Sequence, residues 1–123
     1  MALQISYGLL FIFFISSFIA TTPACRKIDQ HSLRPSFDID SSSLNWSSND
    51  CCRWEGNTCD MFGRVTHLLL PSRGIKGCIS RSLANLTHLL HLNLSHNMLS
   101  GHLEAQIFLS LTRLQILVLS ENH

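Results

Sequence analysis

The second half of the chain repeats an alternation of leucine and other residues at a nearly fixed spacing. Leu68, Leu92 and Leu117 stand 24 and 25 residues apart, and another leucine follows each of them two positions later. Alternate side chains of a strand point to the same face, so each pair of leucines predicts a short strand with one face in a core. Parallel strands need a crossover to return, and a period of this length supplies one, which predicts a parallel solenoid.

Further positions recur with the same offset. Asn97 and Asn122 follow the second and third strands at the same place. Their short amides can bond to backbone groups of the turn, so we interpret them as structural residues. In the connection to the third strand, Leu103, Ile107 and Leu111 are expected to point back into the core.

The N-terminal hydrophobic run has a different character. Residues 1–24 contain no charged side chain, and their core LLFIFFISSFIA (9–20) is apolar apart from two serines. The core is shorter than the roughly 20 residues that span a bilayer, and small residues follow it, so we assign 1–24 as a secretory signal peptide. An uncleaved membrane anchor is the alternative, since Arg26 and Lys27 follow the core and no basic residue precedes it.

Four cysteines, Cys25, Cys51, Cys52 and Cys59, precede the repeats. In an exported chain the oxidising compartment favours disulfides over thiolate chemistry. The alternative is a zinc site in which Cys51, Cys52 and Cys59 are joined by His67. Adjacent cysteines do not match the usual spacing of zinc ligands, so the cluster favours disulfides.

Composition and motifs narrow the function classes. Nine basic and eight acidic side chains give a net charge of +1, which favours neither a nucleic acid nor an anionic membrane as partner. Asn45, Asn85 and Asn93 begin Asn-x-Ser/Thr glycosylation motifs, in agreement with a secretory route. The sequence has no nucleophile elbow, no H-E-x-x-H, no phosphate-binding glycine loop and no kinase segment, so we expect no enzyme activity, metal or cofactor. Cys78 is left over, either as a buried free thiol or in an intermolecular disulfide.

Two segments resemble a known family. The segment LTHLLHLNLSHNMLSGHL resembles the plant-type leucine-rich repeat, LxxLxxLxLxxNxLxGxIP, which it matches at Leu86, Leu89, Leu92, Leu94, Asn97, Leu99, Gly101 and Leu103. LNWSSNDCCRWEGNTCD (44–60), followed by GRVTHLLLPSRG, resembles the N-terminal cap of plant leucine-rich repeat receptors, above all those for small secreted peptides such as tyrosine-sulfated peptides.

The resemblance implies an α/β-type leucine-rich repeat solenoid with short parallel β-strands and loop or 3-10 crossovers. It divides the mature chain into a disulfide-stapled cap at 25–63 and about two and a half repeats at 64–123. The disulfides that it implies are Cys52–Cys59 and Cys25–Cys51. A vicinal Cys51–Cys52 bond is the alternative, at the cost of strain in the peptide between them.

Within the cap, Trp46 and Trp54 are expected to pack over the first coil, where large rings cover much area. The family has a short amphipathic helix after the first cysteine, and Pro35 should end it near Arg34. Asn57 stands where the family has a buried aliphatic residue, so its amide must find partners or lose stability.

In such solenoids, the residues that flank the strand leucines face the concave side and contact the ligand. Here these candidate concave-face contacts are His67, Leu69, Pro71, His91, Asn93, Ser95, Ile116, Val118 and Ser120. Because neighbouring strands lie about 4.8 Å apart, the imidazoles of His67 and His91 are expected to be adjacent. A glycan on Asn93 would obstruct this face.

The resemblance thus implies a non-catalytic extracellular recognition scaffold, the N-terminal fragment of a plant receptor ectodomain for a peptide or protein ligand, with a co-receptor ectodomain as a further partner. One alternative is a short secreted leucine-rich repeat protein that acts as an inhibitor or decoy through protein–protein contacts. Another is a secreted metal-binding or hydrolytic protein that uses Cys78 or Cys59.

The chain stops in mid-coil at His123, so we expect a fragment or truncated product, whose full-length version could carry a C-terminal kinase. It would reach a membrane only through a missing C-terminal segment or an uncleaved anchor. The expected location is the secretory pathway, then the cell wall or the outer face of the plasma membrane.

Overall fold

The computed structural model of the chain describes residues 23–37 and 44–122. The expected signal segment, 1–24, lies outside these residues except for its last two positions. Within the described part of the chain, no helix is long and apolar enough to cross a membrane.

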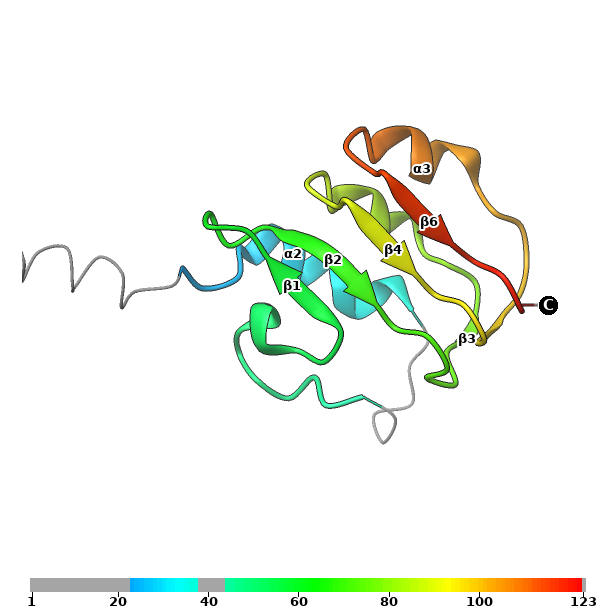
Figure 1. The fold of residues 1–123 in the computed structure, drawn as a ribbon, viewed down its shortest axis with the longest axis horizontal. Coiled ribbons are helices and arrows are strands. Elements are labelled where there is room, and N and C mark those ends of the chain that lie inside the picture. The colour runs from blue at the N-terminus through cyan, green and yellow to red at the C-terminus, as the bar shows by residue number, and fades with distance from the viewer. Residues whose placement is uncertain (1–22, 38–43, 123) are drawn as a thin grey trace, which may run out of the picture.

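A four-stranded sheet forms one side of the molecule (Figure 1). Its order is β1-β2-β4-β6, with β1 at Asn57–Cys59, β2 at Val65–Leu69, β4 at His91–Asn93 and β6 at Ile116–Val118. β2, β4 and β6 run parallel, which confirms the solenoid that the leucine spacing predicts. β1 pairs with β2 in the antiparallel direction and was not predicted by the repeat pattern.

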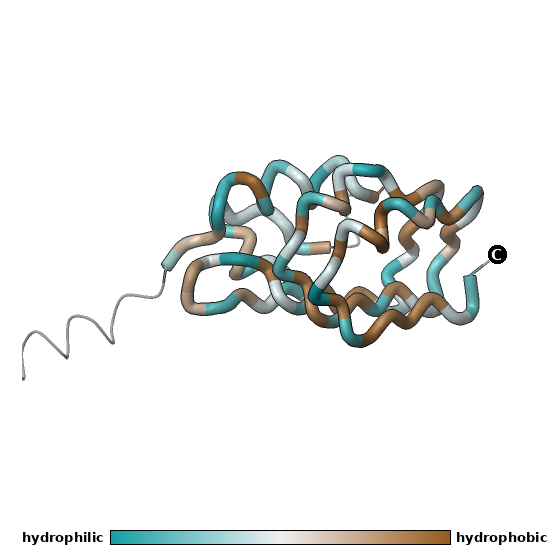
Figure 2. Tube along the Cα trace, turned by 90° about the horizontal axis from the view of Figure 1, so that it is seen from above, coloured by the Kyte–Doolittle hydropathy of each residue, from teal (hydrophilic) through white to brown (hydrophobic). Residues whose placement is uncertain are grey.

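The connections between parallel strands complete each coil, and the coils stack along one axis when viewed from above (Figure 2). Between β2 and β4 the chain passes through β3 (Lys76–Gly77) and the 3-10 helix η3 (Arg81–Asn85). Between β4 and β6 it passes through β5 (Met98–Leu99) and the α-helix α3 (Ala105–Ser110). β3 and β5 pair as a second, two-stranded parallel sheet.

The leucines of the alternation form the core. Leu68 and Leu70 of the first coil are fully buried, as are their equivalents Leu92 and Leu94 in the second. The two leucines of each pair point to the same face because side chains alternate along a strand. The core therefore runs from coil to coil behind the main sheet.

The connection before β6 fits the expectation only in part. Ile107 and Leu111 are buried, as predicted. The prediction for Leu103 is wrong, because this side chain is 57% exposed. It lies between β5 and α3 in the second coil and lines a cleft of about 210 Å³ with Ile79 and Leu119. Among the described residues, no equivalent connection of the third coil packs against it. The inward-facing pattern therefore needs a coil on each side to bury this position.

The side-chain amides of two asparagines join the coils. Asn97 accepts hydrogen bonds from the N–H groups of Arg73 and Ile75 at 2.9 and 3.1 Å. Its amide nitrogen donates to the carbonyl oxygens of Leu70 and Leu94. Asn122 makes the same kind of bonds one coil further on. These contacts confirm a structural role, because each amide satisfies backbone groups of two coils.

The N-terminal end of the solenoid is covered by the helix α2 (Lys27–Leu33), which packs against η3. A 3-10 turn, η1 (Arg34–Ser36), follows it. Pro35 lies in this turn, and the α-helix ends just before it, as expected from the missing N–H of proline. Because α2 takes the place of a preceding coil, the apolar end of the repeats is shielded.

Candidate functional site

Two disulfides staple the cap beneath α2. Cys25 is bonded to Cys51, and Cys52 is bonded to Cys59. This is the pairing that the resemblance implies, and the vicinal alternative does not form. Cys51 and Cys52 begin a 3-10 turn, η2 (Cys51–Arg53), in which Asp50 accepts a hydrogen bond from the N–H of Cys52 at 3.0 Å. The turn presents the two neighbouring sulfurs to different partners.

The four cysteine sulfurs lie within 4.8 Å of one another. Zinc binds cysteine as the thiolate, and a sulfur held in a disulfide is not a thiolate. His67 is not a member of this group. The structure therefore does not support a zinc site made of the three cysteines Cys51, Cys52 and Cys59 together with His67.

Trp46 and Trp54 stack on each other, with ring centres 4.8 Å apart and planes 17° from parallel. The Trp54 ring is buried and packs in the core, and the guanidinium of Arg34 lies 4.8 Å from its centre. Each indole N–H donates to a backbone carbonyl, that of Glu55 for Trp46 and that of Ser48 for Trp54. Both rings are therefore structural parts of the cap.

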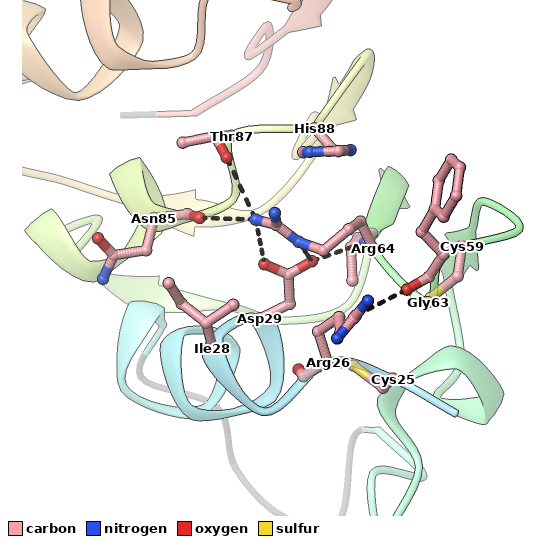
Figure 3. Close-up of polar contacts among 12 residues, drawn as sticks. Cys25, Arg26, Ile28, Asp29, Cys59, Gly63, Arg64, Asn85, Thr87 and His88 are labelled. Carbon is pink, nitrogen blue, oxygen red and sulfur yellow. Dashed lines mark hydrogen bonds and ion pairs between the residues drawn. The ribbon is translucent and has the colours of Figure 1, made fainter. Parts of the chain in front are cut away.

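A buried ion pair connects the cap helix α2 to the start of β2 (Figure 3). Asp29 of α2 is fully buried, and its two carboxylate oxygens accept hydrogen bonds from Nη2 and Nε of Arg64, both at 3.0 Å. The N–H of Val65 donates to the same carboxylate at 2.8 Å. The guanidinium also reaches the Asn85 carbonyl oxygen and the Thr87 hydroxyl of the next coil. One arginine thus joins the cap, β2 and the second coil.

Asn57 lies at the start of β1, beside the disulfides. Its amide nitrogen donates to the carbonyl oxygen of Cys51 at 2.9 Å. Its amide oxygen is buried and has no hydrogen-bond partner among the described residues. The expectation that this amide must find partners is therefore met for the nitrogen alone.

Asp60 occupies the turn between β1 and β2. Partial burial alone would raise the pKa of its carboxyl group, but hydrogen bonds from the N–H groups of Arg64 and Phe62 and from His88 lower this pKa below its ordinary value. Nδ1 of His88 lies 3.2 Å from the Asp60 carboxylate and 3.2 Å from Nη1 of Arg113. This cluster connects the turn to the second and third coils.

Six of the nine predicted concave residues lie in two rows across the parallel strands. The prediction for Ser95 is wrong, because this residue is buried, with 6% exposed. His67, His91 and Ile116 are paired in register in one row. Leu69, Asn93 and Val118 form the other row. Ile116 is exposed and the other five are half-buried, so their side chains are accessible. The rows carry no acidic or lysine and arginine side chains, which makes the surface a mixture of apolar, amide and imidazole groups.

The two histidines of the first row are neighbours, as the spacing predicts. Their ring centres lie 6.0 Å apart, and the planes are inclined by 61°. Nδ1 of His67 lies 2.9 Å from the hydroxyl of Thr66, and this hydroxyl donates to the carbonyl oxygen of Thr58 at 3.2 Å. The Thr66 hydroxyl therefore fixes the orientation of the His67 ring. The repeat pattern did not predict this contact.

The three glycosylation motifs lie in different surroundings. Asn45 and Asn85 are exposed. Asn93 is half-buried in the second concave row, and its amide oxygen accepts hydrogen bonds from the N–H and the hydroxyl of Ser95. These bonds leave the amide nitrogen of Asn93, the atom that carries an N-linked glycan, without a bond to the described residues.

Cys78 is a free cysteine, and its side chain is exposed. The interpretation as a buried thiol is therefore wrong. The sulfur lies against Gly101, where an added Cβ would collide with it. Gly101 has a φ of 87°, a conformation that favours glycine, so the backbone of the neighbouring coil makes room for the thiol. An intermolecular disulfide at Cys78 remains a prediction.

Comparison with curated proteins finds relatives among plant receptors. Receptor-like protein 3 of Arabidopsis thaliana is 46% identical over 61% of this chain and 10% of its own length. Phytosulfokine receptor 1 of the same plant is 39% identical over 92% of this chain and 12% of its own length. No family model matches the chain.

Solved structures give the same result. The BIR2 ectodomain of Arabidopsis thaliana superposes with a TM-score of 0.69 at 28% identity, covering 82% of this chain and 57% of BIR2. The homologues of this chain are plant leucine-rich repeat receptors. The ectodomain of the Arabidopsis receptor kinase HAESA, solved with the peptide hormone IDA and the co-receptor SERK1, superposes with a TM-score of 0.64 at 30% identity. That match covers 79% of this chain and 17% of HAESA.

These matches fall on leucine-rich repeat ectodomains, which are a non-catalytic fold, and the receptor kinases match in their extracellular parts alone. The chain spans about a tenth of the length of the curated relatives that it matches. The comparisons therefore establish the leucine-rich repeat fold, and the relatives that share it are plant receptors.

Proposed function

We propose that the chain forms the capped N-terminal part of an extracellular recognition scaffold that contacts a peptide or protein ligand through its two concave rows. The observation that carries the proposal is the register of these rows across β2, β4 and β6. Accessible side chains repeat there at the strand spacing, so they can follow an extended ligand along the solenoid.

The proposal assigns residues 1–24 as the signal peptide, 25–63 as the cap and 64–123 as the repeats. The chain then passes through the secretory pathway to the cell surface or cell wall, where its disulfides are stable. Glycans are proposed on Asn45 and Asn85, which are exposed. Asn93 also begins a glycosylation motif, but a glycan there would obstruct the second row, so ligand binding by the rows requires Asn93 without a glycan.

The partners are proposed from the receptor context. The HAESA ectodomain was solved with a peptide hormone and a co-receptor ectodomain. The shared fold supports the same two partner classes here, with the ligand held by the concave rows. The rows carry no charged carboxylate or guanidinium, so contacts to the ligand would come from backbone groups, imidazoles, the Asn93 amide and apolar side chains.

A pair of variants tests the surface. Replacing both Leu69 and Val118 with arginine places two charges in the second row, whereas Leu109→Arg changes a residue of α3 that is 74% exposed. The full chain and both variants are immobilised and exposed to phytosulfokine, to IDA and to the SERK1 ectodomain. We expect the double variant to lose binding of at least one probe by tenfold or more and Leu109→Arg to retain it. Equal binding by all three proteins, or no binding of any probe, contradicts the proposal.

A further inference from the structure

The first concave row contains two imidazoles that face the same solvent. His67 and His91 lie opposite each other on β2 and β4, in register. Both rings are half-buried and remain accessible. No acidic side chain stands in the row, whose third member is Ile116. Imidazole nitrogen is a preferred ligand of divalent zinc and copper, and the strands hold two imidazoles side by side here.

The separation of the rings fits a shared ion. A nitrogen–metal bond of about 2.1 Å places the ion roughly 3.2 Å from the centre of an imidazole ring. Two rings on one ion then have centres about 5.2 Å apart at a tetrahedral angle and about 6.4 Å apart in a linear arrangement. The observed separation between His67 and His91 is 6.0 Å, within this interval. The separation of the ring centres is therefore compatible with one shared ion.

The hydrogen bonds of His67 determine which of its nitrogens is free. The hydroxyl of Thr66 has one proton, which it donates to the carbonyl oxygen of Thr58. With this proton on the Thr58 carbonyl oxygen, Nδ1 of His67, 2.9 Å from the same hydroxyl oxygen, is assigned as the donor in that contact. Nε2 of the neutral ring then carries a lone pair. A ligating histidine whose other nitrogen donates to a fixed acceptor is the usual arrangement at metal sites.

His91 supplies the second nitrogen. Among residues 23–37 and 44–122, side-chain hydrogen bonds to histidine rings involve His67 and His88, so the His91 ring is not held by one. The 61° inclination between the two rings is compatible with one shared ion, and His91 has only to turn one nitrogen toward it. His91 can do so by rotation about its Cβ–Cγ bond, which is soft for an imidazole.

We propose that His67 and His91 form a site for a divalent transition-metal ion, Zn²⁺ or Cu²⁺, on the concave surface. Nε2 of His67 and one nitrogen of His91 are the protein ligands, and water completes the coordination of the ion. Thr66 is a positioning residue that fixes the His67 ring and its tautomer. The site is separate from the cysteine cluster, whose sulfurs are held in disulfides.

Titration of the full chain with zinc chloride, followed by calorimetry, tests the site. We expect one Zn²⁺ per chain at this site and a loss of affinity of at least tenfold in His91→Gln. His102→Gln is the matched control, because His102 is an exposed histidine outside the concave rows, and it should bind as the unaltered chain does. Binding that is equal in His91→Gln and the unaltered chain, or no binding by the unaltered chain, overturns the proposal.

Two further measurements separate a specific site from a folding defect. Thr66→Val should lower the affinity for Zn²⁺ by about tenfold, the typical effect of removing an orienting partner, whereas Thr66→Ser should restore it. Nuclear magnetic resonance with Cu²⁺ should broaden the ring signals of His67 and His91 before those of His102. If the signals of all exposed histidines broaden together, the ion binds without a site and the proposal is wrong.

Discussion

The first and third parallel strands carry the same leucine alternation but differ in burial. Leu68 of β2 is fully buried, whereas its equivalent Leu117 of β6 is 42% exposed. β2 lies between β1 and β4, while β6 pairs with β4 on one side among the described residues. The repeat motif therefore determines the strand and its register, but the burial of its leucines depends on what packs on both sides.

The cap supplies at β2 what a preceding coil would supply in the middle of a solenoid. It adds the antiparallel strand β1, the helix α2 and the Asp29–Arg64 ion pair, and two disulfides hold these parts together. Most of these contacts are made by residues far apart in the sequence. The difference between β2 and β6 is thus a difference in tertiary contacts, and variants at the two ends should reveal it.

The largest expected effect comes from the ion pair at the capped end. Asp29→Ala leaves the Arg64 guanidinium and the Val65 N–H without their partner, and breaking a buried pair in this way costs about 4 kcal/mol. Glu104→Ala removes the exposed pair with Arg81, which contributes about 0.5 kcal/mol. Urea unfolding of both variants measures the difference. Equal losses of stability would show that the cap does not depend on the buried pair.

Truncation of equivalent leucines should reproduce the difference in burial. Leu68→Ala removes a fully buried side chain and should lower the free energy of unfolding by about 3 kcal/mol. Leu117→Ala removes one that is 42% exposed and should cost about 1 kcal/mol. The same denaturation experiment compares them, and a larger loss at Leu117 than at Leu68 contradicts the interpretation.

The two ladder asparagines extend the comparison to hydrogen bonds. Asn97 is 5% exposed and its amide takes part in five hydrogen bonds, so Asn97→Ala should cost about 2 kcal/mol. Asn122 is half-buried and solvent can replace part of its four bonds, so Asn122→Ala should cost about 1 kcal/mol. Thermal unfolding followed by circular dichroism distinguishes the two. If both variants lower the melting temperature by the same amount, solvent access does not weaken the hydrogen bonds of these asparagines.

The smallest effect is a pH dependence at Asp60. Its pKa is lowered in the folded chain, so the carboxylate contributes stability that is present above its ordinary pKa of 3.8 and is lost as the pH falls through the folded value. Asp60→Asn removes the titrating group but keeps an oxygen for the N–H groups of Phe62 and Arg64. The stability advantage of the unaltered chain over this variant should shrink as the pH is lowered from about 5 to about 3. A constant advantage across this range contradicts the assignment.

The sequence predicts those features that repeat. The spacing of Leu68, Leu92 and Leu117 gives the parallel strands and their register, and the recurrence of Asn97 and Asn122 gives the ladder. These features are visible because each coil makes the same contacts with its neighbour. The concave positions of His67 and His91 follow from the same period.

Features that depend on one-time contacts could not be predicted. Asp29 and Arg64 are 35 residues apart and belong to no periodic pattern, so their pairing has no signal in one sequence. The contact of Cys78 with the backbone of Gly101 joins two coils, and the exposure of Leu103 goes with its place in the last connection between described strands. In each case, tertiary surroundings decide what the local pattern leaves open.

The most direct test of ligand recognition by the concave rows is hydrogen exchange of the full chain, measured by mass spectrometry. The measurement is made with and without the SERK1 ectodomain or the IDA peptide. If the chain recognises a partner through its concave rows, at least one partner should slow exchange in the strands β2, β4 and β6. The helix α3 on the opposite part of the coil should be unchanged. Slower exchange in α3 with unchanged strands, or no change with either partner, would contradict the account.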